Sequence, residues 1–428
     1  MALSAHEDNE HRRDILLRDF LAVREATETL ARPLAIEDYG MQAMEDVSPT
    51  KWHLAHTSWF FETFILEDYA TDYEPFHPEF RRLFNSYYES VGTFWPRPLR
   101  GLLSRPTVEE VYRYRHFVEE HMRRFIQTTA PSEMDAAWPI IVLGLNHEQQ
   151  HQELLLTDIQ YNLSINPLNP AYTQLKPLDG SRSGESRWIS YEGGLVTIGY
   201  QADGFCFDNE RPAHRQWLEP FRIRDRLVTN REYLEFMLDG GYTTPTLWLS
   251  EGWQHIRSDG WRAPLYWQEL DGEWRRFTLG GLKPVDWEAP VAHVSYFEAD
   301  AFARWAGKRL CREGEWEAAS AGQDPQVGNL LEDGMFRPVP AADADGPLQM
   351  FGDVWEWTQS AYAPYPGYRP ELGALGEYNG KFMSSQQVLR GGSCVTPRSH
   401  IRRTYRNFFP PQARWQFAGI RLAEDASD

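Results

Sequence analysis

The chain has 428 residues and a formal net charge of −19, from 43 Lys and Arg against 62 Asp and Glu. Its length suits two domains, and its 42% hydrophobic content is typical of a globular protein. The negative charge argues against a nucleic-acid partner, because phosphate binding needs clustered Lys and Arg. No stretch is apolar for long enough to span a membrane, and the N-terminus has no apolar secretory core. With only three cysteines, we expect a cytoplasmic protein without a disulfide framework.

Four amphipathic helices are predicted within residues 1–165. The first covers about 11–31, where apolar residues recur at helical spacing. The second begins with Ser48 as N-cap and Pro49 at the first helical position, which is typical of a helix start.

The second helix continues through Trp52 and His56, whose spacing places them on one face. The third opens at Thr107, where Glu110 completes a capping box, and the fourth covers about 135–163. Helices of this length favour a four-helix bundle, in which metal sites are built from side chains on facing helices.

Residues 166–186 are rich in Pro, Gly and Ser and are predicted to form a linker. From 187 to 428, short β-like runs alternate with Gly, Pro and most of the 17 tryptophans. This sequence pattern indicates an irregular α+β domain that is stabilised by aromatic packing rather than by a large sheet. The elements predicted there are strands at 194–199 and 387–390, and helices at 230–238 and 296–307.

The clearest signal is the segment HEQQH at 147–151. Positions i and i+4 of a helix share a face, so His147 and His151 can direct their imidazoles at one atom. The alternative is a helix that carries two solvent-facing histidines. Apolar residues on both sides of the segment favour a buried face and therefore a metal site.

The same segment fits the zincin pattern, in which two histidines bind zinc and Glu148 acts as the base. Such a site needs a third ligand, and His56 on the second helix is the candidate, with His53 sharing part of its face. Three neutral nitrogen donors suit Fe(II), zinc or copper, so the donor set leaves the metal open. The open coordination positions would serve an oxygenase or a hydrolase.

Two segments, SPTKWHLAHTSWFFETF from 48 and HEQQHQE from 147, resemble the DinB-like domain of ergothioneine-biosynthesis sulfoxide synthases of the EgtB type. The back half resembles their second domain, which has the C-type-lectin-like fold of the formylglycine-generating enzyme. The matching sequence motifs are FDNERP at 207–212, LVTNREY at 227–233, GEWEAA at 314–319, GDVWEW at 352–357, LRGGS at 389–393 and FAGIR at 417–421. The resemblance implies a multidomain α+β protein. A DinB-like four-helix bundle at 1–165 carries the metal ligands, and a second domain at 187–428 completes the substrate pocket.

The resemblance further implies a non-haem Fe(II) site at His56, His147 and His151. It implies that O₂ couples the sulfur of a cysteine-type thiol to C2 of the imidazole of hercynine (trimethylhistidine), giving a sulfoxide. The expected partners are then the small molecules hercynine, cysteine and O₂.

Three residues are implied to bind substrate. Gln150 lies between two ligands, where its amide can reach a metal-bound ring, and Asn407 with Phe408 holds hercynine in the family. A trimethylammonium group donates no hydrogen bonds, so aromatic faces suit it. Taken without the resemblance, Asn407 reads as a turn residue.

Position 409 bears on the thiol. Family members that use γ-glutamylcysteine have an Asp directly after the Asn–aromatic pair, whereas Phe409 matches the cysteine-using branch. Free cysteine is therefore predicted, with γ-glutamylcysteine or a selenium donor as alternatives. Arg97 and Arg100 are candidates for bidentate pairing with the substrate carboxylate, the alternative being ordinary surface arginines.

The chemistry also needs a proton donor. Tyr87 and Tyr88 resemble the tyrosine pair of the cysteine-using branch, and a phenol can protonate reduced oxygen. Packing tyrosines are the alternative, and Tyr365 and Tyr368 are further candidates because other branches place their donor in the second domain.

The sequence also bears on three other activities. Formylglycine-generating enzymes use two cysteines in the segment after the Arg-Gly-Gly-Ser motif. In this chain that segment holds only Cys394, so we do not expect their activity. A zinc hydrolase with Glu148 as base, and a thiol-binding module without turnover, remain as competing hypotheses.

Overall fold

The computed structural model describes residues 2–178, 185–342 and 344–426. By its internal contacts the chain divides into two units, Met1–Ile165 and Asn166–Asp428. The predicted linker at 166–186 falls partly on 179–184, which lie outside the described residues. Its earlier part belongs to the second unit, where the Thr173 N–H donates to the Leu279 carbonyl at 3.0 Å. Across the described ranges, no helix has the length and apolar character needed to cross a membrane.

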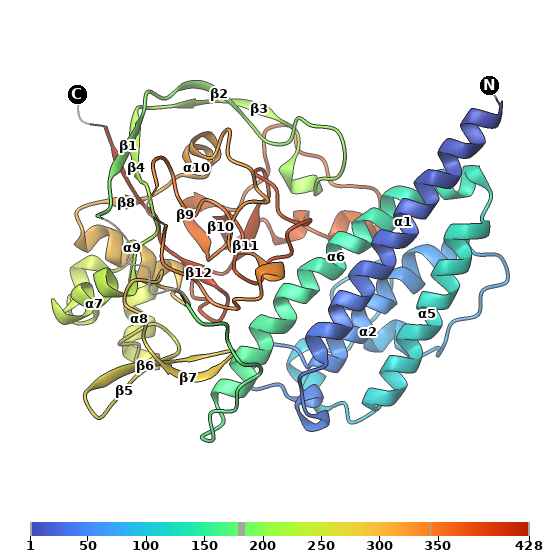
Figure 1. The fold of residues 1–428 in the computed structure, drawn as a ribbon, viewed down its shortest axis with the longest axis horizontal. Helices are drawn as coiled ribbons and strands as arrows, with labels where there is room; N and C mark the ends of the chain where they lie inside the picture. Colours follow the sequence, from blue (N-terminus) through green and yellow to red (C-terminus); the bar gives the residue numbers. More distant parts are fainter. Residues whose placement is uncertain (1, 179–184, 343, 427–428) are drawn as a thin grey trace. The chain divides into compact units, whose positions relative to one another are not determined.

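The first unit is helical. Helices α1, α2, α5 and α6 lie side by side, with α2 contacting each of the other three (Figure 1). A π-helical turn, η2, directly continues α2, and such turns are frequent near functional sites. The elements are α1 (Ala2–Ala31), α2 (Thr50–Phe61), η2 (Glu62–Leu66), α3 (Glu67–Tyr69), α4 (Phe80–Leu83), α5 (Val108–Thr128) and α6 (Pro131–Ser164).

The four long helices were expected, and their ends differ from the prediction for identifiable reasons. At α5 the capping box is confirmed, because Thr107 Oγ1 accepts from the Glu110 N–H and Glu110 accepts from the Thr107 N–H. Helix α6 begins earlier than expected, with Pro131 in its first turn, where the missing N–H of proline costs no hydrogen bond. Helix α1 likewise begins earlier, at Ala2.

The predicted N-cap of α2 was wrong. Pro49 occupies the cap position, and no side chain caps the helix. The Ser48 hydroxyl instead accepts a hydrogen bond from Arg100 at 2.9 Å, and its backbone N–H donates to Asp158 at 2.8 Å. The start of α2 is therefore held by a buried arginine and by a carboxylate of α6.

A glycine sets the spacing between α2 and α6. A Cβ at Gly144 would lie 2.6 Å from an atom of the Phe61 ring and 3.0 Å from one of the Phe60 ring. Both rings belong to α2, so a larger side chain at this position would push the two helices apart. Gly144 lies one turn before His147, and the close approach therefore brings the histidines of the two helices together.

The second unit combines short strands with four helices in its described part. Its helices are α7 (Asn230–Leu238), α8 (Ser250–Asp259), α9 (Tyr296–Trp305) and α10 (Glu313–Ala319). Its strands are β1 (Trp188–Tyr191), β2 (Gly194–Ile198), β3 (His214–Leu218), β4 (Phe221–Arg224), β5 (Trp267–Leu270), β6 (Glu273–Thr278), β7 (Gly281–Pro284), β8 (Arg309–Leu310), β9 (Trp355–Ala361), β10 (Gln387–Arg390), β11 (Asn407–Phe409), β12 (Ala418–Gly419) and β13 (Leu422–Asp425). The expected helices at 230–238 and 296–307 and the strands at 194–199 and 387–390 are confirmed within two residues, whereas α8 and α10 were not predicted.

Among the described residues these strands form two four-stranded sheets, one three-stranded sheet and one two-stranded ribbon. The orders of the larger sheets are β1-β4-β13-β8 and β11-β10-β9-β12. Strand β10 is central, and it pairs antiparallel with β9 on one side and with β11 on the other. No large sheet forms in the described part of this unit, as the sequence indicated.

Candidate metal centre

Helix α2 presents His56 between two tryptophans. The rings of Trp52 and Trp59 stack nearly parallel to the imidazole, with centroids 4.5 and 5.4 Å away. Trp52 is four residues before His56 and Trp59 three after it, so all three side chains share one helical face. These contacts fix the ring of His56 in the core of the bundle, where it is fully buried.

Helix α6 supplies His147 and His151 from successive turns. Their ring centroids lie 4.6 Å apart, and His147 also packs against Phe60 of α2 at 4.7 Å. Both histidines are buried. The alternative of a helix with two solvent-facing histidines is therefore contradicted by the structure.

The three histidines converge. One ring nitrogen from each of His56, His147 and His151 lies within 4.8 Å of the others, and Nε2 of His56 is 3.2 Å from Nε2 of His147. We call this set the histidine triad. Burial lowers the pKa of all three imidazoles, that of His147 to about 3. The triad is therefore neutral near pH 7, which is the form that binds metals.

Hydrogen bonds orient two members of the triad. The Phe84 carbonyl can only accept, so His56 donates to it from Nδ1 at 2.5 Å and keeps the lone pair on Nε2. Nδ1 of His151 lies 2.9 Å from Nδ1 of His53, and Nε2 of His53 lies 3.0 Å from the Asp158 carboxylate. Closely spaced neutral imidazoles, each with a lone pair on one ring nitrogen, fit a divalent first-row metal ion.

Glu148 lies between two members of the triad in sequence but belongs to a different cluster. It is fully buried, and its carboxylate accepts hydrogen bonds from Arg24 at 3.0 Å, from Arg115 at 2.5 Å and from Thr27 at 2.7 Å. The geometry is that of a structural ion pair linking α1, α5 and α6. A general base must reach a water molecule at the metal, so the zinc-hydrolase hypothesis loses its base.

The loop after α4 brings the predicted tyrosines toward the triad. Tyr88 is fully buried and its ring packs against Trp59 at 5.6 Å, the same indole that stacks on His56. Tyr87 is half-buried and stacks on Tyr88 at 4.6 Å. The Asn85 side chain braces the loop through hydrogen bonds to the backbone of Tyr88.

Of the two arginine candidates, Arg97 is exposed and Arg100 is fully buried. The Arg100 guanidinium lies 3.3 Å above the Trp52 ring and donates to the hydroxyls of Ser48 and Ser86. Burial lowers its pKa well below the usual range, and among the described carboxylates none lies within ion-pair distance of it. Arg100 is therefore not an ordinary surface arginine but a buried guanidinium, which makes no ion pair among the described residues and has Asp158 as a nearby negative charge.

Gln150, the remaining candidate of this unit, is half-buried on α6 between His147 and His151.

The second unit places the other substrate candidates on β11. Asn407, Phe408 and Phe409 are all half-buried. The Asn407 side-chain oxygen accepts a hydrogen bond from the backbone N–H of Phe408 at 2.9 Å. Phe408 stacks on Tyr362 at 4.1 Å, and Phe409 meets Trp415 edge-on at 5.7 Å.

The further tyrosines of this unit are engaged by carboxylates. Tyr365 donates to Glu313 at 3.0 Å, and Tyr368 donates to Asp208 at 2.7 Å. Burial raises the pKa of both phenols. Each phenol proton is therefore already held by a neighbouring carboxylate.

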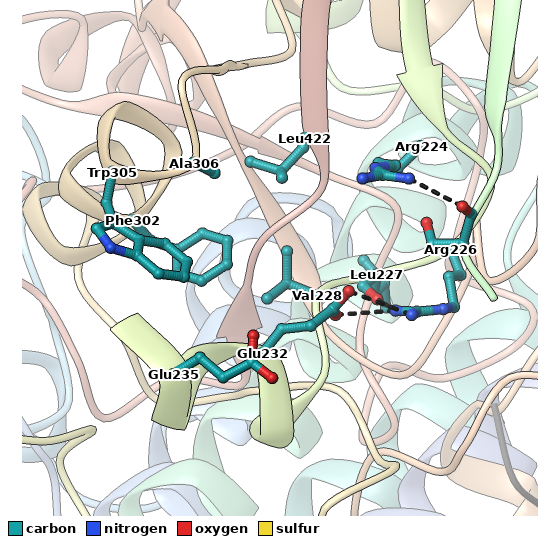
Figure 2. A pocket seen from close by; sticks show the side chains of 11 residues that line it. Arg224, Arg226, Leu227, Val228, Glu232, Glu235, Phe302, Trp305, Ala306 and Leu422 are labelled. Atoms are coloured by element: carbon teal, nitrogen blue, oxygen red, sulfur yellow. Dashed lines mark hydrogen bonds and ion pairs between the residues drawn. The ribbon is translucent and has the colours of Figure 1, made fainter. Parts of the chain in front are cut away.

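A small pocket also lies in the second unit, between α7, α9 and the strands β4 and β13 (Figure 2). It has a volume of about 170 Å³, and its apolar wall includes Phe302, Trp305 and Leu422. Its charged side is closed by an ion pair in which Arg226 contacts both carboxylate oxygens of Glu232. None of the residues predicted to bind substrate lines it.

Two features of the first unit escaped the sequence interpretation. The sequence places His53 beside His56 on one helix face, but it does not predict the contacts of His53 with His151 and with Asp158. Asp158 lies two helical turns after His151, and this spacing was the available signal. The arginines of the Glu148 cluster gave no comparable signal, since they come from distant segments.

Comparisons with known proteins cover both units. The family model described as the sulfatase-modifying factor enzyme 1-like domain matches residues 179–329 and 333–426. The chain is 34% identical over 409 residues to the hercynine oxygenase of Mycolicibacterium smegmatis, which covers 89% of this chain and 91% of that protein. It is 37% identical over 310 residues to the hercynine oxygenase of Mycobacterium tuberculosis, covering 67% of this chain and 71% of that one. It is also 29% identical over 281 residues to the formylglycine-generating enzyme of Streptomyces coelicolor, covering 52% of this chain and 84% of the other.

Proposed function

The chain belongs to the hercynine oxygenase family and contains a sulfatase-modifying factor enzyme 1-like domain, and from this premise we propose that it joins cysteine to hercynine with O₂ at a non-haem iron(II) site. The observation that carries the proposal is the buried, neutral histidine triad within 4.8 Å. His56, His147 and His151 would hold the iron and leave further coordination positions open. Bound there, iron(II) would supply the activation of O₂.

The proposed reaction balances without a further reductant. A bond forms between the cysteine sulfur and C2 of the hercynine imidazole, while the S–H and C2–H bonds break. One oxygen atom of O₂ becomes the sulfoxide oxygen, and the other leaves as water with the two hydrogens. The four electrons that reduce O₂ therefore come from the two substrates.

The chain's own residues would position the substrates and supply protons. Buried Arg100 suits a carboxylate, because a charge-assisted hydrogen bond in a dry site is stronger than one in water. Asn407 and Phe408 would hold hercynine, with Gln150 reaching a metal-bound ring. Tyr88 Oη, backed by Tyr87, is the proposed proton donor to O₂ as it is reduced.

The test is turnover of the full chain. Protein loaded anaerobically with Fe(II) is expected to consume O₂ and form the C–S coupled sulfoxide when hercynine and cysteine are both present. Product is followed by mass spectrometry, and omission of either substrate is the control. Tight substrate binding without O₂ uptake would instead support the thiol-binding module, and absence of product with every thiol or selenol donor would refute the proposal.

The choice of thiol has a separate test at position 409. Phe409→Asp is expected to raise kcat/KM for γ-glutamylcysteine relative to cysteine by roughly 10–100-fold, because a carboxylate hydrogen-bonded to an amino group contributes about 1.5–3 kcal/mol. Phe409→Leu, which removes the ring without adding charge, is the matched control. An unchanged ratio in the Asp variant relative to the Leu variant would contradict the assignment of this position.

A further inference from the structure

We propose that His53 and Asp158 are positioning residues for the metal centre: together they hold the imidazole of His151 in the tautomer that leaves its Nε2 lone pair for the metal. The inference rests on the proposed function in one respect, namely that the triad binds a metal ion. It adds two residues that are not ligands, and it assigns each a defined hydrogen-bonding direction.

The donor and acceptor roles along these hydrogen bonds are set first at Asp158. One oxygen of this buried carboxylate accepts the backbone N–H of Ser48 at 2.8 Å and faces Nε2 of His53 at 3.0 Å. A carboxylate accepts hydrogen bonds but does not donate them, so His53 carries its proton on Nε2. A His151 ring that binds a metal through Nε2 carries its proton on Nδ1, so the facing Nδ1 of His53 is the acceptor and the proton of His53 lies on the Nε2 that faces Asp158.

The hydrogen bond between His53 and His151 then sets the tautomer of the ligand. Nδ1 of His53 lies 2.9 Å from Nδ1 of His151, and two lone pairs at this distance would repel each other. His151 therefore donates from Nδ1, and its other nitrogen, Nε2, has no proton. The result is a relay from Asp158 through His53 to His151, in which each donor–acceptor role is fixed by the previous one.

Both ring nitrogens of His53 are engaged in this relay, which separates its role from that of a ligand. His53 lies one turn before His56 on α2, and Asp158 lies two turns after His151 on α6. The relay thus ties the two ligand-bearing helices together at the site. His56 is oriented by another means, the neutral Phe84 carbonyl, so loss of the relay should disturb one ligand and spare the other.

The tautomer can be observed directly in the metal-free full chain. Two-bond ¹H–¹⁵N correlation spectra of protein labelled with ¹⁵N-histidine distinguish Nδ1–H from Nε2–H imidazoles. We expect His151 to carry its proton on Nδ1 and His53 on Nε2, with both assignments made from single variants. A spectrum that places the His151 proton on Nε2 would overturn the proposal, whatever the activity.

Metal affinity gives a second readout, with Co²⁺ as the probe. His53→Phe keeps the ring shape but removes the acceptor, and is expected to weaken Co²⁺ binding about 10–100-fold, the usual effect of losing a partner behind a metal-binding histidine. His53→Asn places an amide oxygen near the former Nδ1 and should recover most of the affinity. A merely structural role for His53 would not produce this rescue.

Asp158→Asn is the variant of choice if His53→Phe fails to fold, because it keeps an acceptor for Ser48 while removing the charge. It should weaken Co²⁺ binding less than His53→Phe. His121→Phe is the matched control, since this histidine donates to the Phe117 carbonyl outside the triad and should leave the affinity unchanged. Wild-type Co²⁺ affinity in His53→Phe and Asp158→Asn, or no gain from His53→Asn, would overturn the relay.

These outcomes are separable from those of the proposed function. Relay-dependent Co²⁺ binding without any C–S product would refute the reaction and leave the relay standing. Formation of the sulfoxide with unchanged affinity in every relay variant would do the reverse.

Discussion

Replacing His147 by alanine is expected to remove the metal and to abolish product formation. The triad supplies three nitrogens within 4.8 Å of one another. Among the described residues no carboxylate belongs to this cluster, so the two remaining histidines have no substitute for the donor that is lost with His147. The loss of metal affinity should exceed the roughly 10–100-fold effect expected for an outer partner such as His53. Metal content after anaerobic loading and O₂ uptake with both substrates measure the two effects.

The same substitution at His121 is the matched control for His147→Ala. His121 is partly buried on α5 and packs on Phe117, so its loss tests the general cost of removing a histidine from the bundle. We expect normal metal content and turnover in that variant. Wild-type iron content and activity in His147→Ala would show that the triad is not the iron site.

The order of these effects distinguishes two kinds of contribution. His147 would bind the metal itself, whereas His53 would only fix the orientation of a ligand. Removing the first should eliminate binding, and removing the second should weaken it while the metal still binds at high concentration. The two classes of variant therefore separate in a Co²⁺ titration even where both lose activity.

The sequence was most informative where the structure is local. The capping box at Thr107 is a contact between residues three apart, and the i, i+4 spacing of His147 and His151 depends only on helical geometry. Both features could be read without knowledge of the fold. The start of α2 could not, because Arg100, which removes Ser48 from its capping role, comes from a segment 52 residues away.

The same distinction applies to the candidate site. His56 could be paired with the HEQQH segment only by supposing that two helices face each other, and the structure supports this through Gly144 and the rings of α2. Glu148 shows the opposite case. Its place beside a histidine suggested a base, but the residues that decide its role, Arg24 and Arg115, lie on other helices.

Glu148→Gln is expected to destabilise the first unit strongly rather than to remove a catalytic base. Arg24 and Arg115 are fully buried, and Glu148 lies between them as a common anion, with Glu28 contacting only the second arginine. Removing one partner of a buried ion pair costs about 3–5 kcal/mol, because the remaining charges stay in a medium of low polarity. For a unit of this size, this corresponds to a fall in its Tm of roughly 10 °C.

Asp135→Asn is the matched control for Glu148→Gln, since it makes the same charge change at an exposed position of α6. It should alter stability by no more than about 0.5 kcal/mol. At temperatures where the Gln variant remains folded, the iron hypothesis predicts that it still forms the sulfoxide. Wild-type stability combined with complete loss of a zinc-supported activity would favour the hydrolase instead.

The pH dependence of this destabilisation provides an independent check. Burial by itself would raise the pKa of Glu148, but the charges of Arg115 and Arg24 outweigh it and leave the pKa below its ordinary value. A carboxylate with a lowered folded-state pKa stabilises the fold above its unfolded pKa, and this contribution is lost as the pH falls through the folded value. The difference in unfolding free energy between wild type and Glu148→Gln should therefore be full near pH 7 and shrink below about pH 4.5. Denaturant unfolding at a series of pH values measures it, and a difference independent of pH would mean that packing, rather than the ionised carboxylate, accounts for the loss.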